Sequence, residues 1–405
     1  MKGPFTVLKD GSITSPKGFE AGATYAGLKA PKEGQLDFGI LLSRTLTATA
    51  GVFTTSEIKS PSVTLSQRNL AGGKTHGVVA NSGCANACVG DQGFKDAEET
   101  TRLAAKHVGS NTEELLMCST GLIGAELPMA LIRAAVPNIN LSPEGGHAFA
   151  HAVMTTDRFP KEIAVTFDLG GATATLAGCA KGAGMIHPDM ATMLCFLTTD
   201  ATVDQGFLQQ ALKKAVDASL NMISVDGDSS TNDTVLLFAN GAAGNAPVHA
   251  GTPEARVFQE ALLYVCTHLG HEIVRDGEGA TKVIEVTVEG AKSLQEARHA
   301  ARTISSSLLV KAAVHGNDPN WGRVMMALGK SRIYLEENKI AVYLNDVCLM
   351  EHGLPIPFFR EAVVSTMRAT TVRFRVDLNV GDASATAWGC DISEEYVHFN
   401  SAYVT

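Results

Sequence analysis

Short apolar runs with polar ends alternate along the chain with amphipathic stretches of helical period. Such runs are typical of buried strands, and apolar positions that recur every three or four residues are typical of helices covering a sheet. The alternation therefore predicts a mixed α/β protein. Residues 5–80 are predicted to form strands and turns, followed by strands near 116–119, 163–167, 173–180, 192–198, 282–288, 340–345 and 371–380, and by helices over 94–108, 127–136, 145–154, 204–220, 253–275 and 292–308.

The segment 181–200 combines a glycine-rich loop with a strand. Glycines after Lys181 give its backbone unusual freedom, and Pro188 interrupts any helix or ladder. An apolar run begins directly after the small Ala191, so the hydroxyl of Thr192 is predicted at the junction of a kinked loop and a rigid strand. A threonine at a strand start is most often only a β-former. At this junction it also suits a nucleophile that attacks a carbonyl.

Composition and charge exclude several classes of protein. Of 405 residues, 45% are hydrophobic and 19% are charged, which excludes global disorder. The formal net charge of −9 and the absence of a basic run make the chain a poor binder of nucleic acid or of an anionic membrane. No segment reaches about 18 uninterrupted apolar residues, and the first residues lack the apolar region of a signal peptide. We therefore expect a soluble, cytoplasmic protein.

Metal sites are not predicted. Eight scattered cysteines, several inside apolar runs, indicate buried free thiols in a reducing compartment. Cys84 and Cys88 could be ligands, but no second Cys/His pair follows at zinc spacing. The aspartate-rich segment 224–235 invites a calcium interpretation, yet an EF-hand loop would need glycine and glutamate where Thr231 and Leu237 stand. A turn with side-chain-to-backbone hydrogen bonds is the alternative.

The strand near 116–119 opens into a turn of small residues that begins with Ser119, Thr120 and Gly121. Backbone N–H groups at such a turn can hold a developing oxyanion, although an ordinary strand-to-helix turn has the same pattern. The lysine and glycines at 181–184 do not form a phosphate-binding loop, because the order of glycine, lysine and hydroxyl residue is wrong.

Two strings around Thr192 resemble the self-cleavage signature of the ornithine acetyltransferase family, the glutamate N-acetyltransferases of arginine biosynthesis. They are Lys181-Gly-Ala-Gly-Met-Ile and Met190-Ala-Thr-Met-Leu. Similar motifs occur from about residue 81 to the end, among them Asn81-Ser-Gly-Cys-Ala-Asn-Ala and Gly277-Glu-Gly-Ala-Thr-Lys. In that family the precursor cuts itself between Ala and Thr, and the freed threonine becomes the nucleophile. The resemblance assigns this bond to Ala191 and Thr192.

The resemblance also implies roles for residues far apart in the sequence. Thr120 and Gly121 would form the oxyanion hole, and the loop after Asn81 would line the pocket. The terminal tail would fold over the active site. Substrate would be bound by Thr155, Lys181, Thr192, Glu278, Asn400 and Thr405, with Thr156 as an alternative to Thr155.

The implied fold is an α/β/β/α layered sandwich like that of N-terminal-nucleophile enzymes. It would comprise a catalytic domain (1–284) and a smaller mixed α/β domain (285–405) whose tail closes on the active site. Cleavage would give an α chain (1–191) and a β chain (192–405), and two such αβ units would form a heterotetramer. The implied activity is ping-pong acetyl transfer from N2-acetylornithine to glutamate through acetyl-Thr192. No cofactor is implied, and acetyl-CoA remains open as a second acetyl donor.

Two other functions fit parts of the pattern. A self-processing aminopeptidase would keep the cleavage, but those relatives use serine where this chain has Thr192. An uncleaved amino-acid-binding protein would make Thr192 purely structural. The motifs around Lys181 and Glu278 favour the transferase.

Overall fold

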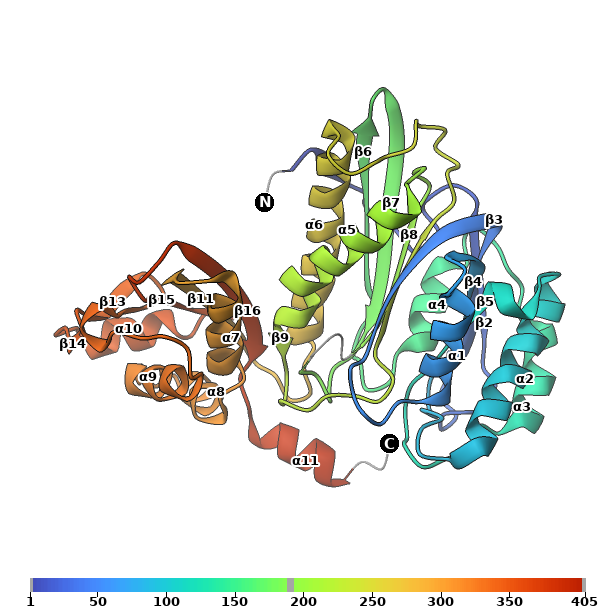
Figure 1. Ribbon diagram of the computed structural model, residues 1–405. Helices are drawn as coiled ribbons and strands as arrows, with labels where there is room; N and C mark the ends of the chain where they lie inside the picture. The colour runs from blue at the N-terminus through green and yellow to red at the C-terminus, as the bar shows by residue number, and fades with distance from the viewer. Residues whose placement is uncertain (1–2, 188–192, 403–405) are drawn as a thin grey trace.

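The computed structural model describes residues 3–187 and 193–402, which form two β-sheets with helices packed on them (Figure 1). In the first sheet the pairs β8–β10 and β4–β5 are parallel, and the other pairs are antiparallel. In spatial order its strands are β1 (Phe5–Val7), β6 (Lys161–Leu169), β7 (Ala172–Lys181), β8 (Leu194–Thr199), β10 (Thr234–Ala239), β3 (Phe38–Phe53), β4 (Lys74–Asn81) and β5 (Leu115–Ser119), with β2 (Phe19–Thr24) paired to β3.

The long strand β3 divides the first sheet into two halves that face each other. Its first residues pair with β2 and β4, its last residues pair with β10, and its register on β4 shifts between Leu42 and Thr47. Successive side chains of β8 point to opposite faces of the sheet and so enter two different cores. Phe196 belongs to an inner core shared with β4 and β5, whereas Cys195 and Leu197 belong to a core under the helices.

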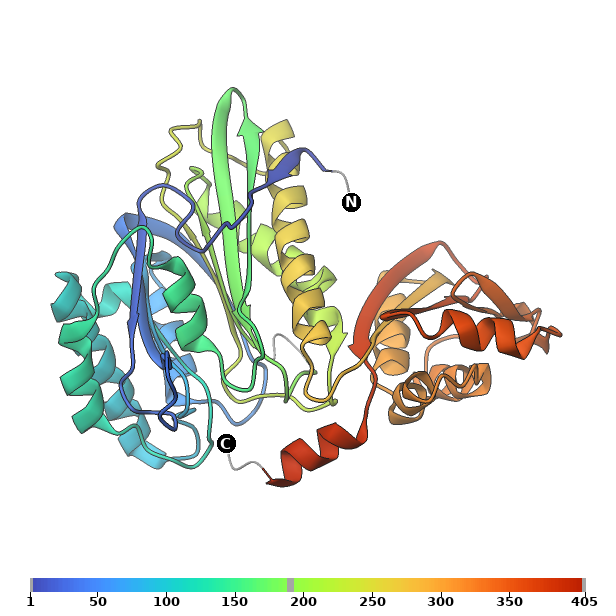
Figure 2. The same cartoon turned by 180° about the vertical axis from the view of Figure 1, so that it is seen from behind.

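Helices cover both outer faces of the folded sheet. α5 (Gln205–Ala218) and α6 (Pro253–Arg275) pack on the half that contains β6 and β7. α1 (Pro61–Leu70) and α2 (Gly90–Val108) pack on the half that contains β4 and β5, and α3 (Met129–Ala135) packs beside α2. Figure 2 shows these two helical layers on opposite sides. The layering confirms the predicted α/β/β/α sandwich.

The inner layer is completed by α4 (Gly146–Val153), which contacts strands of both halves. Its Phe149 meets Phe196 of β8 edge to face, with ring centroids 5.1 Å apart. Both rings are fully buried, so α4 is held as part of the core. Four 3₁₀ turns lie within the described residues: η1 (Thr112–Glu114), η2 (Val136–Asn138), η3 (Leu220–Met222) and η4 (Glu337–Lys339).

The second sheet has a separate hydrophobic core. Its edge strand β9 comes from the predicted catalytic domain, residues 1–284, and the predicted boundary after residue 284 falls inside β11. The tail helix α11 (Glu394–Ala402) returns from this sheet toward the first (Figure 1). In spatial order the strands are β14 (Leu354–Pro355), β13 (Val347–Glu351), β12 (Ala341–Leu344), β15 (Thr371–Asp377), β11 (Val283–Ala291), β16 (Ala383–Cys390) and β9 (Ile223–Ser224), with helices α7 (Leu294–Ser305), α8 (Leu308–His315), α9 (Trp321–Lys330) and α10 (Arg360–Thr366).

Two predictions of secondary structure were wrong. The single helix predicted over 292–308 is two helices, because Ser307 is extended and becomes the N-cap of α8. Helix α1 falls in a region predicted to hold strands and turns. Ser60 caps it and Pro61 occupies its first turn, a start signal that the sequence contained. The strand predicted over 192–198 is described from Leu194 to Thr199.

All eight cysteines are free thiols, and six of them are buried, as predicted. Cys88 is exposed, whereas Cys84 is buried and donates to the carbonyl oxygen of Ala125. None of the helices among the described residues has the length and apolar character that a membrane span requires.

Candidate active site

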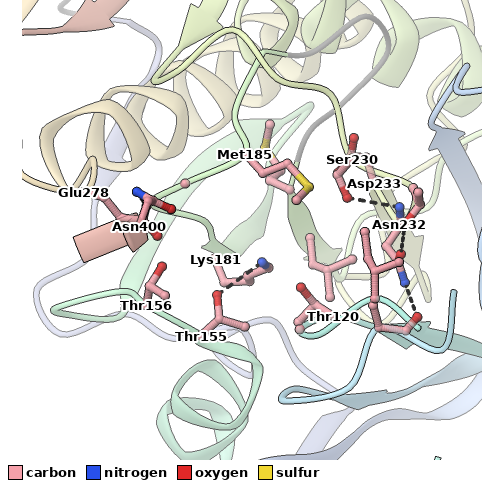
Figure 3. A pocket seen from close by; sticks show the side chains of 17 residues that line it. Thr120, Thr155, Thr156, Lys181, Met185, Ser230, Asn232, Asp233, Glu278 and Asn400 are labelled. Carbon is pink, nitrogen blue, oxygen red and sulfur yellow. Dashed lines mark hydrogen bonds between the residues drawn. The ribbon is translucent and has the colours of Figure 1, made fainter. Parts of the chain in front are cut away.

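A polar cavity lies where residues from both halves of the first sheet meet (Figure 3). Strands β5 and β7 end beside it, and β8 and β10 begin beside it. The ends of strands are suitable places for functional side chains, because the sheet fixes their backbone while the loops remain open to a ligand. The lining residues are Ala85, Thr120, Gly121, Ile123, Thr155, Thr156, Lys181, Gly184, Met185, Met193, Leu194, Ser230, Thr231, Asn232, Asp233, Glu278 and Asn400.

Thr120 and Gly121 form one wall, directly after β5. Gly121 has a φ of 128°, which favours glycine, and an added Cβ would lie 2.3 Å from the carbonyl carbon of Gly83. The turn is therefore packed against the loop after β4. Ala85 of that loop also lines the cavity, as the loop was predicted to do. Thr120 is 8% exposed and also lines the cavity.

Lys181 is the last residue of β7 and provides a buried cation. Its side chain is 9% exposed, and its Nζ donates to Oγ1 of Thr155 over 3.4 Å. Burial lowers the pKa of Lys181, and the carboxylates of Asp157 and Asp233 partly oppose this shift. Thr155 and Thr156 both line the cavity, but only Thr155 has a hydrogen bond to the lysine.

Glu278 provides a carboxylate on another wall, where the tail helix reaches the cavity. Its Oε2 accepts a hydrogen bond from Nδ2 of Asn400 on α11 at 2.9 Å. The Glu278 carboxylate occupies the space beside Gly184, where an added Cβ would lie 2.5 Å from it. Figure 3 shows Glu278 and Asn400 together, on the far side of the cavity from Asn232 and Asp233.

A fully buried ion network positions these walls. Nζ of Lys161 lies 2.5 Å from Asp157 and 2.7 Å from Asp276, and all three side chains are inaccessible to solvent. Asp157 accepts further hydrogen bonds from the N–H groups of Thr155 (2.9 Å) and Gly182 (2.7 Å). Burial alone would raise the pKa of Asp157, but Lys161, Lys181 and the N–H of Gly182 together hold it below its ordinary value.

The segment before β10 contributes four cavity residues that sequence reasoning missed: Ser230, Thr231, Asn232 and Asp233. Asn232 donates to the carbonyl oxygens of Ala85 (2.6 Å) and Ser119 (2.8 Å), so it ties the two loops after β4 and β5 together. Asp233 is 3% exposed, and burial raises its pKa well above the ordinary value. All four residues occur in the segment 224–235, which was predicted only as a turn. The turn itself is confirmed by hydrogen bonds within it.

The structure brings six of the predicted site residues to one cavity. Ala191, Thr192 and Thr405 lie outside the described residues, although Met193, which follows Thr192 in the chain, lines the cavity. Within the described parts of the chain, no group of three or more His, Cys, Asp or Glu side chains is placed to hold a metal ion. The residues gathered at the cavity are Thr120, Gly121, Thr155, Lys181, Glu278 and Asn400.

The fold and the cavity define a class of protein. A layered α/β sandwich carries a small polar cavity with a buried cation, a carboxylate and hydroxyl groups on separate walls. Such a cavity suits a small ligand with charges of both signs, as in enzymes that act on amino acids.

A model of the ArgJ family matches residues 20–405. The arginine biosynthesis bifunctional protein ArgJ of Symbiobacterium thermophilum is 49% identical, over 98% of this chain and 99% of its own length. The protein of the same name from Dehalococcoides mccartyi is 46% identical over 100% of both chains. The crystal structure of arginine biosynthesis bifunctional protein argJ from Bacillus halodurans is 40% identical with a TM-score of 0.50, and the match covers 51% of this chain and 97% of that chain.

The chain therefore belongs to the ArgJ family, and it is an acyltransferase of arginine biosynthesis.

The buried network around Lys161 generates a stability prediction. Lys161→Met would leave Asp157 and Asp276 buried without their shared cation, so the free energy of unfolding should fall by about 3–5 kcal/mol. The matched control is Lys213→Met, which removes an ion pair with Asp217 on the surface of α5. That change should cost at most about 0.5 kcal/mol. Chemical denaturation measures both, and equal losses in the two variants would contradict the role given to the network.

Proposed function

We propose that the chain transfers the acetyl group of N-acetylornithine to glutamate through an acetyl ester on Thr192. The main support for this proposal is that residues of the segment between β7 and β8 line the polar cavity. Met193 lines the cavity together with the cation of Lys181 and the turn at Thr120 and Gly121. A nucleophile next to Met193 in the chain would thus act beside groups suited to bind substrate and to hold an oxyanion.

The nucleophile would be produced by the chain itself. In this scheme the hydroxyl of Thr192 attacks the carbonyl carbon of Ala191, the peptide nitrogen leaves as an amine, and water hydrolyses the resulting ester. The products are the chains 1–191 and 192–405. The matched Bacillus halodurans chain, which corresponds to 51% of this one, has the length expected of one such fragment and supports this step.

The new α-amine would act as the general base, since its reference pKa is roughly 8. It takes the proton of the Thr192 hydroxyl as the oxygen attacks the acetyl carbonyl, and it gives that proton to the departing ornithine amine. In the second half-reaction the amine of glutamate attacks the ester, and the proton returns to the threonine oxygen. The α-amine thus accepts and returns one proton in each half-reaction.

Thr120 and Gly121 would stabilise the negative oxygen of each tetrahedral intermediate. Thr120 lines the cavity, and its hydroxyl could donate a hydrogen bond to an oxyanion there. The backbone at Gly121 is fixed by its contact with Gly83, which would keep its N–H preorganised.

Lys181 and Glu278 would recognise the charged ends of the substrates. Lys181, with Thr155 beside it, is suited to a carboxylate, and Glu278, with Asn400 beside it, is suited to an ammonium group. The terminal residue, Thr405, would complete the site from the tail. Acetyl-CoA as a second donor would fit the word bifunctional in the names of the relatives.

The proposal extends to the assembled protein. A catalytic domain of residues 1–284 and a smaller domain of residues 285–405 would share the active site through the tail. The two fragments would stay associated, and two αβ pairs would form a heterotetramer in the cytoplasm. The reaction would need no metal and no bound cofactor.

The proposed nucleophile is tested by the intact mass of the purified protein. The wild-type protein should consist of the pieces 1–191 and 192–405 and should transfer acetyl groups from N-acetylornithine to glutamate. Thr192→Ala should remain one chain without transfer, because it lacks the attacking oxygen. Thr192→Ser keeps a hydroxyl and should still be cut. A wild-type chain that stays whole would instead favour an uncleaved amino-acid-binding protein.

The oxyanion wall is tested by Gly121→Ala. The added Cβ would collide with Gly83, displace the turn and lower kcat by about 10²–10³-fold. Gly124→Ala is the matched control, because Gly124 also has a positive φ, of 85°, but has open space around it. Steady-state kinetics on folded, cleaved protein measures kcat for both variants. An equal kcat in the two variants would argue against an oxyanion role for this wall.

A further inference from the structure

The cavity wall at Gly184 and Met185 is held from behind by one carboxylate, that of Asp226. Its Oδ2 accepts a hydrogen bond from the N–H of Met185 at 2.6 Å, and its Oδ1 accepts one from the N–H of Ile186 at 2.9 Å. Oδ1 also accepts one from the N–H of Asp228 at 3.2 Å. Burial raises the pKa of Asp226, and these three N–H groups oppose that shift by stabilising the ionised carboxylate. A single side chain thus fixes two successive amides of the wall.

The backbone of this wall has a conformation that its sequence does not favour. Met185 has a φ of 54°, in the left-handed region that residues with a Cβ rarely adopt. The adjoining residues are also docked on their neighbours. The carbonyl oxygen of Ile186 accepts from the N–H of Val225 at 2.7 Å, and that of Ala183 accepts from the N–H of Glu278 at 2.8 Å. Surrounding contacts must therefore hold Met185 in place.

Asp226 also lies where the second sheet and the tail helix reach the cavity. It follows β9, whose Ser224 carbonyl oxygen accepts from Nζ of the fully buried Lys311 at 3.3 Å. The same Nζ donates to the carbonyl oxygen of Cys390 at the end of β16, at 2.7 Å. The tail helix α11 also comes close to Asp226. The pKa of its Tyr396 is raised, mainly by burial and secondly by the negative charge of Asp226. The second sheet, the tail helix and the cavity wall therefore converge on one residue.

We propose that Asp226 is a positioning residue, which holds Met185 and Ile186 in the geometry that substrate binding and self-cleavage require. It acts through the backbone of its neighbours, since it is not among the described residues that line the cavity. The inference rests on the proposed function, because the chain runs from this wall to the proposed cleavage bond. It adds a role for the second sheet, whose edge strand leads directly into Asp226.

The contact is tested first without any activity, by hydrogen–deuterium exchange in the uncut Thr192→Ala chain. Asp226→Asn replaces one carboxylate oxygen by an amide that donates toward the same backbone N–H groups. The exchange of the Met185 and Ile186 amides should then rise by about tenfold or more. Asp228→Asn is the matched control: Asp228 lies in the same turn, is exposed, and loses the same charge. It should leave the exchange of both amides unchanged.

The positioning role is tested next, in the chain that retains Thr192. Asp226→Asn should slow the appearance of the two fragments by about tenfold and raise the KM for N-acetylornithine. Asp228→Asn should match the wild type in both. Adding Met185→Gly to Asp226→Asn should recover part of the cleavage rate, because glycine adopts positive φ without penalty. A general folding defect would not be recovered in this way.

Each outcome has one meaning. Faster exchange together with unchanged cleavage and unchanged KM would overturn the positioning role. Unchanged exchange would overturn the contact itself. A wild-type chain that remains uncut would reject the proposed cleavage instead, and the exchange experiment would still decide whether Asp226 holds the wall.

Discussion

The buried ammonium group of Lys161 joins three walls of the cavity. It lies between Asp157 and Asp276, and none of the three side chains is accessible to solvent. Asp157 accepts hydrogen bonds from the N–H groups of Thr155 and of Gly182, the residue after Lys181. Asp276 lies two residues before Glu278. Charges buried this deeply are stable only when their partners are correctly placed. The network therefore fixes the relative positions of side chains that come from the segments after α4 and α6 and from the end of β7.

The opposite charges of the cavity depend on this arrangement. Lys181 and Glu278 lie on different walls, and each has a neutral partner, Thr155 and Asn400 respectively. A hydroxyl or an amide can donate to a ligand or accept from it, so each wall can adapt to a new ligand group without a new charge. This property suits the proposed acetyl transfer, in which two substrates would occupy one site in turn.

The sequence predicted local features well, and long-range contacts only through resemblance. The layered α/β fold follows from alternating apolar runs, and α6 has the predicted bounds because its pattern is long and strongly periodic. The division between α7 and α8 depends on one serine, a weak local feature. Thr120, Glu278 and Asn400 could be grouped only because their motifs resemble those of a known family.

Residues that act through buried tertiary contacts could not be predicted from the sequence pattern. Lys161 begins an ordinary strand, and nothing near it in the sequence indicates that Asp276 will neutralise it. Asp226 was correctly placed in a turn, but its bonds to Met185 and Ile186 link segments about 40 residues apart. Tertiary packing creates these relationships, and single-residue propensities carry no information about them.

In the proposed mechanism the acetyl group passes through Thr192. The most direct measurement is the intact mass of the 192–405 fragment after the cleaved protein is mixed with N-acetylornithine alone and quenched. This fragment should gain one acetyl group at its first residue and should lose it again when glutamate is added. Turnover of both substrates with no acetyl group on the fragment at any time would contradict this mechanism.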